Sequence, residues 1–191
     1  MPKWIIHLRD HLGRLWQSLL PPQSPAPIKA NKNIAFALVR PRREVNRVFL
    51  HCTASDHAHH DNLQTLHAWH VEQNGWSDIG YHYLITFDGG IHVARPIEHT
   101  PAAQAGHNTG TIAIALSGGQ NGKPDAFTQR QFQSLRQLCH SINRAYDHQI
   151  TFHGHCEVAP GRACPVYDYC NILGLNSRGE MKNVVKEGGE T

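Results

Sequence analysis

The two ends of the chain differ from its middle in their pattern of apolar and polar positions. Near the start, apolar side chains recur at spacings of three and four, which is the periodicity of an amphipathic helix. These positions are Ile5, Leu8, Leu12, Leu15 and Leu19. Four prolines between positions 21 and 27 stop this helix, so residues 1–33 are assigned to a helix and a proline-rich linker. Residues 176–191 are rich in Gly, Glu and Lys and are expected to form a flexible tail.

The middle of the chain, residues 34–175, alternates between strand and helix periodicities. Apolar or alternating stretches predict strands at 48–50, 81–87, 91–93, 111–116 and 150–152. A helical period predicts one helix over 62–73 and another that begins at the capping box of Thr128 and Gln131. Asp88-Gly89-Gly90 is typical of a hairpin turn. The pattern predicts a single α/β (α+β) domain with a mixed central β-sheet flanked by helices.

Length and composition exclude several classes of protein. The chain has 191 residues, of which 40% are hydrophobic and 17% charged, and this fits one folded domain rather than a disordered chain. The net charge of +3 is small, so no nucleic-acid partner is expected. Five cysteines are an odd number, which argues against a disulfide framework and favours free or metal-bound thiols. We expect a monomer.

The N-terminal segment also bears on where the protein acts. Arg9, Asp10 and Arg14 interrupt the continuous apolar core that a secretion signal needs. No apolar run reaches the roughly 18 residues of a membrane span. We therefore expect synthesis in the cytoplasm without a clear signal peptide. The helix within residues 3–20 is expected to dock on its own domain or on a second copy of the chain, and a peripheral contact with a membrane surface is the alternative.

The densest chemistry lies in residues 153–165, HGHCEVAPGRACP. Two imidazoles and two thiols occur here, and Pro160-Gly161 predicts a turn that folds Cys164 back towards His155. Imidazole and thiolate together suit Zn²⁺. His51, at the end of a predicted strand, is the natural third donor. A site of His51, His155 and Cys164 leaves one tetrahedral position open, as catalytic zinc sites do.

Other histidines and thiols compete with this assignment. His153 lies two residues from His155 on an extended segment, so both side chains can face the same way. Cys156 follows His155 directly and is the rival thiol. The cluster DHAHHD, residues 56–61, is a second rival, although its polar surroundings favour a solvated loop.

Three motifs in order along the chain carry a family resemblance. They are His51-Cys52-Thr53-Ala54, the segment GWSDIGYHY at 75–83, and residues 155–165. Together they resemble the zinc-dependent N-acetylmuramoyl-L-alanine amidases, a group that contains phage lysozyme-type amidases and peptidoglycan recognition proteins. The similarity covers roughly residues 46–170 and implies the fold of that family.

The resemblance implies roles for individual residues. It assigns one zinc ion per chain to His51, His155 and Cys164, and it makes Tyr81 the active-site tyrosine. Arg162 departs from the family pattern, because the catalytic members commonly have lysine at this position. Arginine keeps its positive charge but does not give up a proton at neutral pH. The strand at 112–116 also lacks the carboxylate that some relatives use in catalysis.

The implied activity is hydrolysis of the amide bond between N-acetylmuramic acid and L-alanine in peptidoglycan. This fits an endolysin-like enzyme that acts on the periplasmic or cell-wall polymer, and a non-catalytic peptidoglycan-binding module is the alternative. Glu157 is interpreted either as a proton shuttle or as a brace for its turn. Trp76 and His70 are expected to be core residues rather than substrate contacts.

Overall fold

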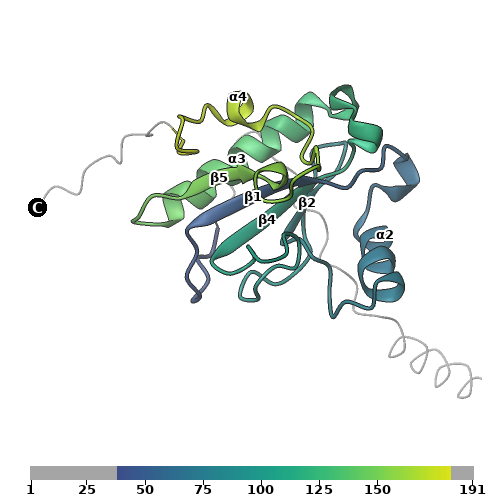
Figure 1. Cartoon of the computed structure of the whole chain (residues 1–191), viewed down its shortest axis with the longest axis horizontal. Coiled ribbons are helices and arrows are strands. Elements are labelled where there is room, and N and C mark those ends of the chain that lie inside the picture. Colours follow the sequence, from purple (N-terminus) through teal and green to yellow (C-terminus); the bar gives the residue numbers. More distant parts are fainter. Residues whose placement is uncertain (1–37, 182–191) are drawn as a thin grey trace, which may run out of the picture.

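A computed structural model describes residues 38–181, which form a sheet with helices on both faces (Figure 1). The predicted helix and linker at residues 1–33, and residues 182–191 of the predicted tail, lie outside the described part. The strands are β1 (Arg47–Cys52), β2 (Tyr83–Ile85), β3 (Ile91–Val93), β4 (Thr111–Leu116) and β5 (Thr151–Gly154). The longer helical segments are α2 (Leu63–His67), η2 (Ala68–Gln73), α3 (Gln129–Ala145) and α4 (Tyr169–Leu173). Single turns of 3₁₀ helix are η1 (Ala58–His60), η3 (Gln120–Gly122), η4 (Pro124–Ala126) and η5 (His155–Glu157).

The five strands form one mixed sheet in the order β3-β2-β4-β1-β5, which confirms the predicted fold class. β1 runs parallel to both β4 and β5, β2 runs parallel to β4, and only the hairpin of β2 and β3 is antiparallel. All six residues of β4 are buried, as expected for a central parallel strand that is covered on both faces.

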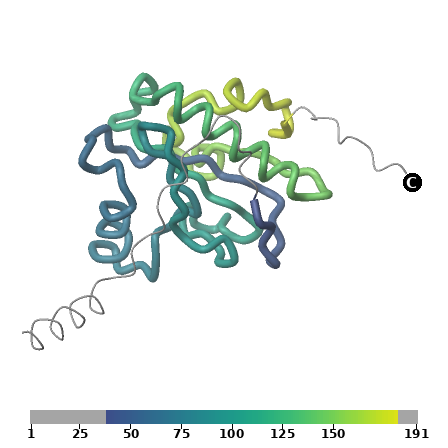
Figure 2. The backbone as a smooth tube through the Cα atoms, turned by 180° about the vertical axis from the view of Figure 1, so that it is seen from behind, coloured from purple at the N-terminus to yellow at the C-terminus, as the bar shows by residue number. Residues whose placement is uncertain are grey.

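Alternate residues of the strands pack into two apolar clusters, one on each face of the sheet. Ile114 belongs to the larger cluster, which includes Leu135 and Leu138 of α3. Ala115 belongs to the smaller cluster beside Leu66 of α2. The helix α4 lies beside α3 (Figure 1 and Figure 2), and its Leu173 also joins the larger cluster. The main hydrophobic core therefore lies on the α3 side of the sheet, and the apolar cluster on the α2 side is smaller.

The predicted capping box starts α3. The Thr128 hydroxyl accepts from the Gln131 N–H at 3.2 Å, and the Gln131 side chain accepts from the Thr128 N–H at 2.9 Å. The Gln131 amide also donates to the carbonyls of Ile85 and Ser117. The cap thus joins the start of the helix to the ends of β2 and β4.

The helix predicted over residues 62–73 begins at the Asn62 cap as α2 and continues as the π-helical η2. It ends at Gly75, whose φ of +70° favours glycine. The turn carries Trp76 to the surface, where 40% of it is exposed and its ring stacks on His70 at 4.8 Å. The expectation of a core residue was therefore wrong for Trp76, because the left-handed turn directs the chain away from the core.

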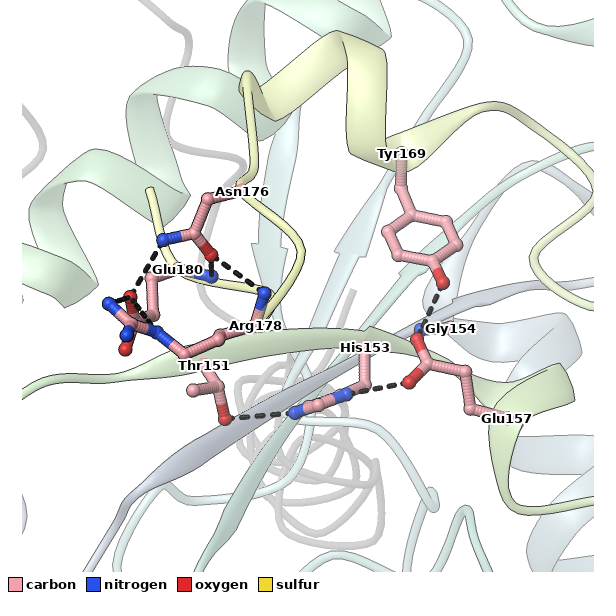
Figure 3. Close-up of polar contacts among 8 residues, drawn as sticks. All are labelled: Thr151, His153, Gly154, Glu157, Tyr169, Asn176, Arg178 and Glu180. Carbon is pink, nitrogen blue, oxygen red and sulfur yellow. Dashed lines mark hydrogen bonds and ion pairs between the residues drawn. The ribbon is translucent and has the colours of Figure 1, made fainter. Parts of the chain in front are cut away.

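The predicted tail is ordered over its first residues. Residues 179–181 extend the sheet edge beside β5: the Phe152 N–H donates to the Gly179 carbonyl at 2.8 Å, and Met181 is buried. Figure 3 shows Glu180 held by Asn176 and Arg178. Unpaired backbone groups of an edge strand favour such a cover, so a flexible tail was the wrong expectation for residues 176–181. Within residues 38–181, no helix has the length and apolar character to cross a bilayer.

Candidate active site

Two neighbouring parallel strands bring His51 and His155 together. His51 is the fifth residue of β1 and lies level with Ala115 of β4, on the α2 side of the sheet. His155 directly follows β5, whose last residue Gly154 pairs with Leu50. Because parallel strands end at the same edge of a sheet, the two imidazole rings meet with their centroids 4.7 Å apart.

A turn after β5 returns Cys164 to the same place. Gly161 has a φ of +83° in this turn, and the Arg162 N–H donates to the Ala159 carbonyl. The Cys156 N–H closes the loop by donating to the Cys164 carbonyl at 2.7 Å. The Cys164 sulfur then lies 3.8 Å from His51 Nδ1. The predicted fold-back through Pro160-Gly161 thus occurs.

The three donor atoms of His51, His155 and Cys164 all lie within 4.8 Å of one another. Two imidazole nitrogens and one sulfur form the borderline-soft set that tetrahedral zinc prefers. The backbone N–H of Cys52 also donates to the Cys164 sulfur at 3.3 Å, which is the contact that a thiolate needs. The residues present therefore fit a zinc ion.

The electrostatics of the site keep both imidazoles neutral. Burial, followed by the neighbouring His155, lowers the pKa of His51 to about 3, and only 1% of His51 is exposed. Burial and the charge of Arg162 lower the pKa of His155. A hydrogen bond with Cys52, together with burial, raises the pKa of the Cys164 thiol. The Cys164 thiol therefore stays protonated without a metal, and a bound cation would displace its proton.

The rival residues lie outside this cluster. His153 is bound through both ring nitrogens, to Glu157 at 2.7 Å and to Thr151 at 2.8 Å (Figure 3). His57, His59 and His60 contact one another by their rings in the loop around η1. In the stretch from residue 38 to residue 181, only His51, His155 and Cys164 have donor atoms grouped closely enough for a metal.

Tyr81 borders the cluster. Its ring centroid lies 5.1 Å from that of His51 and 5.3 Å from that of His70, which in turn stacks on Trp76. Burial raises the pKa of Tyr81, and the nearby Cys164 adds to the shift, so the phenol stays protonated at neutral pH. Among residues 38–181 the Tyr81 hydroxyl has no hydrogen-bond partner. It is therefore free to donate to a ligand.

Glu157 is fully engaged by residues of β5 and α4, as Figure 3 shows. One carboxylate oxygen accepts from the Gly154 N–H at 2.8 Å and from the Tyr169 hydroxyl at 2.5 Å, and the other contacts His153. Although burial opposes the shift, the hydrogen bonds from Tyr169 and His153 lower the pKa of Glu157. This favours the interpretation of Glu157 as a brace.

Gln104 contacts the cluster and was missed by the sequence analysis. Its side-chain oxygen lies 3.1 Å from His51 Nε2, and the residue is buried. No apolar periodicity or motif marks this position, since the contact joins residues 53 positions apart. The only local signal is the Gly106-His107-Asn108 loop that follows it.

The family can be assigned on the sequence together with this geometry. Residues 41–167 match the family Amidase_2, described as N-acetylmuramoyl-L-alanine amidase. The chain belongs to the N-acetylmuramoyl-L-alanine amidase family. The endolysin of Enterobacteria phage T3 is 36% identical over 132 residues, which are 68% of this chain and 85% of the endolysin. This amidase assignment confirms the predicted family and enzyme class.

Further similarities connect the amidase fold to recognition proteins. The endolysin N-acetylmuramoyl-L-alanine amidase LysCS from Clostridium intestinale superposes with a TM-score of 0.60 at 28% identity, covering 69% of this chain and 83% of LysCS. Peptidoglycan-recognition protein SC1a/b from Drosophila simulans is 30% identical over 105 residues, which are 54% of this chain and 55% of that protein. This chain is thus similar both to proteins named as endolysins and to a protein named for peptidoglycan recognition.

Proposed function

We propose that the protein hydrolyses the amide bond between N-acetylmuramic acid and L-alanine in peptidoglycan, with one zinc ion held by His51, His155 and Cys164. The observation that carries the proposal is the closeness of these three donor atoms, all within 4.8 Å, in a chain of the amidase family. The similarity to phage endolysins supports a lytic role, in which the enzyme is made in the cytoplasm and acts on the cell wall.

The chain's own residues divide the work of amide hydrolysis. A bound zinc ion supplies Lewis acidity, which polarises a carbonyl group and activates water. Tyr81 keeps its proton and is positioned to donate it in a hydrogen bond to the oxygen on which negative charge develops. Arg162 lies on the exposed turn before Cys164, and its charge acts on both Tyr81 and His155. It therefore stabilises the anionic transition state from the solvent side.

A large polymer can reach this site. Arg162 is exposed and His155 and Cys164 are half-buried, whereas His51 lies beneath them in the sheet. The three donor residues are thus held by the sheet on the side of His51 and are partly exposed to solvent on the side of His155 and Cys164. This arrangement supports a polymeric substrate that lies across the end of the sheet.

The second candidate function is a peptidoglycan-binding module that does not cut its ligand. The similarity to peptidoglycan-recognition protein SC1a/b favours it. Such a module needs a surface that binds the ligand but not the zinc chemistry. The two functions differ in whether a bound muropeptide is converted to products.

The decisive experiment combines metal analysis with product analysis. Purified protein is expected to contain about one zinc per chain, and mass spectrometry of a defined muropeptide is expected to show separate glycan and peptide products. Cys164→Ser and His155→Ala are expected to lose zinc and cleavage together. Full zinc in both variants would contradict the ligand set, and binding without cleavage by the zinc-loaded protein would support the recognition module.

Matched controls separate loss of a ligand from loss of structure. Cys156→Ser changes the other half-buried thiol of the same segment, and His140→Ala changes a half-buried histidine of α3. Neither side chain belongs to the cluster. Both control variants are expected to keep zinc and cleavage.

A further inference from the structure

Gln104 connects the buried histidine of the site to the loop between β3 and β4. The residue is 1% exposed, and its Oε1 atom lies 3.1 Å from Nε2 of His51. An amide oxygen only accepts hydrogen bonds. The contact is therefore a hydrogen bond only when His51 carries its proton on Nε2.

The loop around Gln104 is fixed by its own hydrogen bonds. The Asn108 side-chain oxygen accepts from the backbone N–H of Ala103 at 3.1 Å and from that of Gln104 at 3.0 Å. Thr111, at the start of β4, is fully buried and pairs with Arg47 in the sheet. Gln104 is thus held between a rigid loop and the central strands.

A chain of donors and acceptors determines which way the Gln104 amide faces. The Thr111 hydroxyl donates its proton to the Asn108 carbonyl at 2.7 Å, so its oxygen is left to accept. Gln104 Nε2 lies 2.8 Å from that oxygen and 3.5 Å from the His107 carbonyl. Both neighbours accept, so the amide nitrogen belongs on this side and the amide oxygen faces His51.

We propose that Gln104 is a positioning residue that sets the tautomer and the orientation of His51. With the proton on Nε2, the lone pair of His51 lies on Nδ1, the atom 3.8 Å from the Cys164 sulfur. We call the hydrogen bonds that link Asn108, Thr111 and Gln104 the relay. The relay therefore leaves Nδ1 of His51 free to bind the metal. The consequence for metal binding rests on the proposed zinc site. The hydrogen bonds around Gln104 do not depend on that site.

The first test reads the tautomer directly in metal-free protein. Nitrogen-15 NMR of the His51 ring is expected to show the proton on Nε2 in the wild type. In Gln104→Leu, which cannot accept, a mixture of tautomers is expected. A pure Nε2–H tautomer in Gln104→Leu would overturn the proposal, whether or not the protein cleaves peptidoglycan.

The second test measures zinc affinity by competition with a chelating dye. Loss of a group that orients a metal-binding histidine typically costs about 10–100-fold in affinity, and a weakening of this size is expected for Gln104→Leu. Gln104→Glu keeps an acceptor for the Nε2 proton but loses the amide donor to Thr111, so it is expected to recover only part of the affinity that Gln104→Leu loses. Unchanged affinity in Gln104→Leu, or no rescue by Gln104→Glu, would count against the proposal.

Two further variants keep the test decisive. Gln131→Leu removes an equally buried glutamine of the α3 cap, away from the cluster, and is expected to lower stability without changing zinc affinity or the tautomer.

Thr111→Val removes the relay oxygen while keeping the side-chain shape, so that a folded relay variant exists even if Gln104→Leu does not fold. It is expected to weaken zinc binding, and wild-type affinity in Thr111→Val would contradict the relay. A wild type that binds no zinc would instead refute the proposed function and leave the tautomer result standing.

Discussion

Arg162 stands two residues before Cys164, where the family resemblance predicts a lysine. Its side chain is exposed, yet its charge acts on Tyr81 and His155. A positive charge at this position can stabilise a developing oxyanion, but arginine does not exchange a proton near neutral pH. We therefore propose an electrostatic role for Arg162, in which the charge of the side chain matters more than its shape.

Substitutions at Arg162 test this role. Arg162→Lys keeps the charge and is expected to keep or raise cleavage of purified cell walls. Arg162→Ala is expected to lower the rate about 100-fold, as removal of an oxyanion-stabilising donor does, with zinc content unchanged. Complete loss of cleavage by Arg162→Lys with zinc still bound would contradict the electrostatic assignment.

The Tyr81 hydroxyl is the other group expected to contact the reacting amide. Tyr81→Phe keeps the ring beside His51 and His70 but removes the donor. We expect about a 100-fold lower rate constant for cleavage, measured at saturating muropeptide, with zinc content and thermal stability close to the wild type. A stability loss without a rate loss would assign Tyr81 to packing alone.

At the scale of an element, the segment from β5 through η5 carries His155, and Glu157 holds that segment in place. Its carboxylate joins Gly154, Tyr169 and His153. Glu157→Ala is expected to destabilise the fold by roughly 1 kcal/mol, because the buried Gly154 N–H and two half-buried side chains lose their acceptor, and to weaken zinc binding through His155. Denaturant unfolding and dye competition measure the two effects.

The same residue distinguishes bracing from proton transfer. Glu157→Gln keeps an acceptor oxygen but cannot deliver a proton. If Glu157 only holds its segment in place, this variant is expected to retain most of its cleavage activity at full zinc loading. Abolished cleavage with zinc and stability intact would show that Glu157 is the proton shuttle instead.

The elements that the sequence predicts correctly are those specified by neighbouring residues. The capping box at Thr128 and the stop at Gly75 depend on contacts within four residues, and both occur as expected. The closeness of His51, His155 and Cys164 was also predictable, because strand ends and a Pro-Gly turn are local features. Gln104 and residues 179–181 act through partners far away in the chain, and nothing in their own neighbourhood indicates those partners.

At the scale of the whole molecule, the two faces of the sheet have different tasks. The α3 face holds the larger apolar cluster, against which Cys164 also packs, whereas Tyr81 packs against the smaller cluster on the α2 face. Some buried polar groups of the sheet are held by hydrogen bonds to the backbone. His82 is one of them: it is 0% exposed, accepts from the Ala113 N–H at 3.0 Å and donates to the His99 carbonyl at 2.9 Å.

The neutral state of His82 makes stability depend on pH. Burial lowers the pKa of His82 from 6.5 to about 4. Because the unfolded chain then binds the proton more readily than the folded protein, the contribution of His82 is complete above pH 6.5. It is lost as the pH falls towards 4. At one pKa unit per 1.36 kcal/mol, the expected loss between pH 7 and pH 5 is about 2 kcal/mol.

Denaturant unfolding at pH 7 and pH 5, in the presence of a chelator, measures this contribution by comparison with His82→Gln. Glutamine offers an acceptor and a donor but does not titrate, so the variant is expected to lose about 2 kcal/mol less than the wild type over this range. The other histidines are common to both proteins and cancel in the comparison. Equal losses would mean that protonation of His82 costs the folded protein nothing, which its burial and its hydrogen bonds argue against.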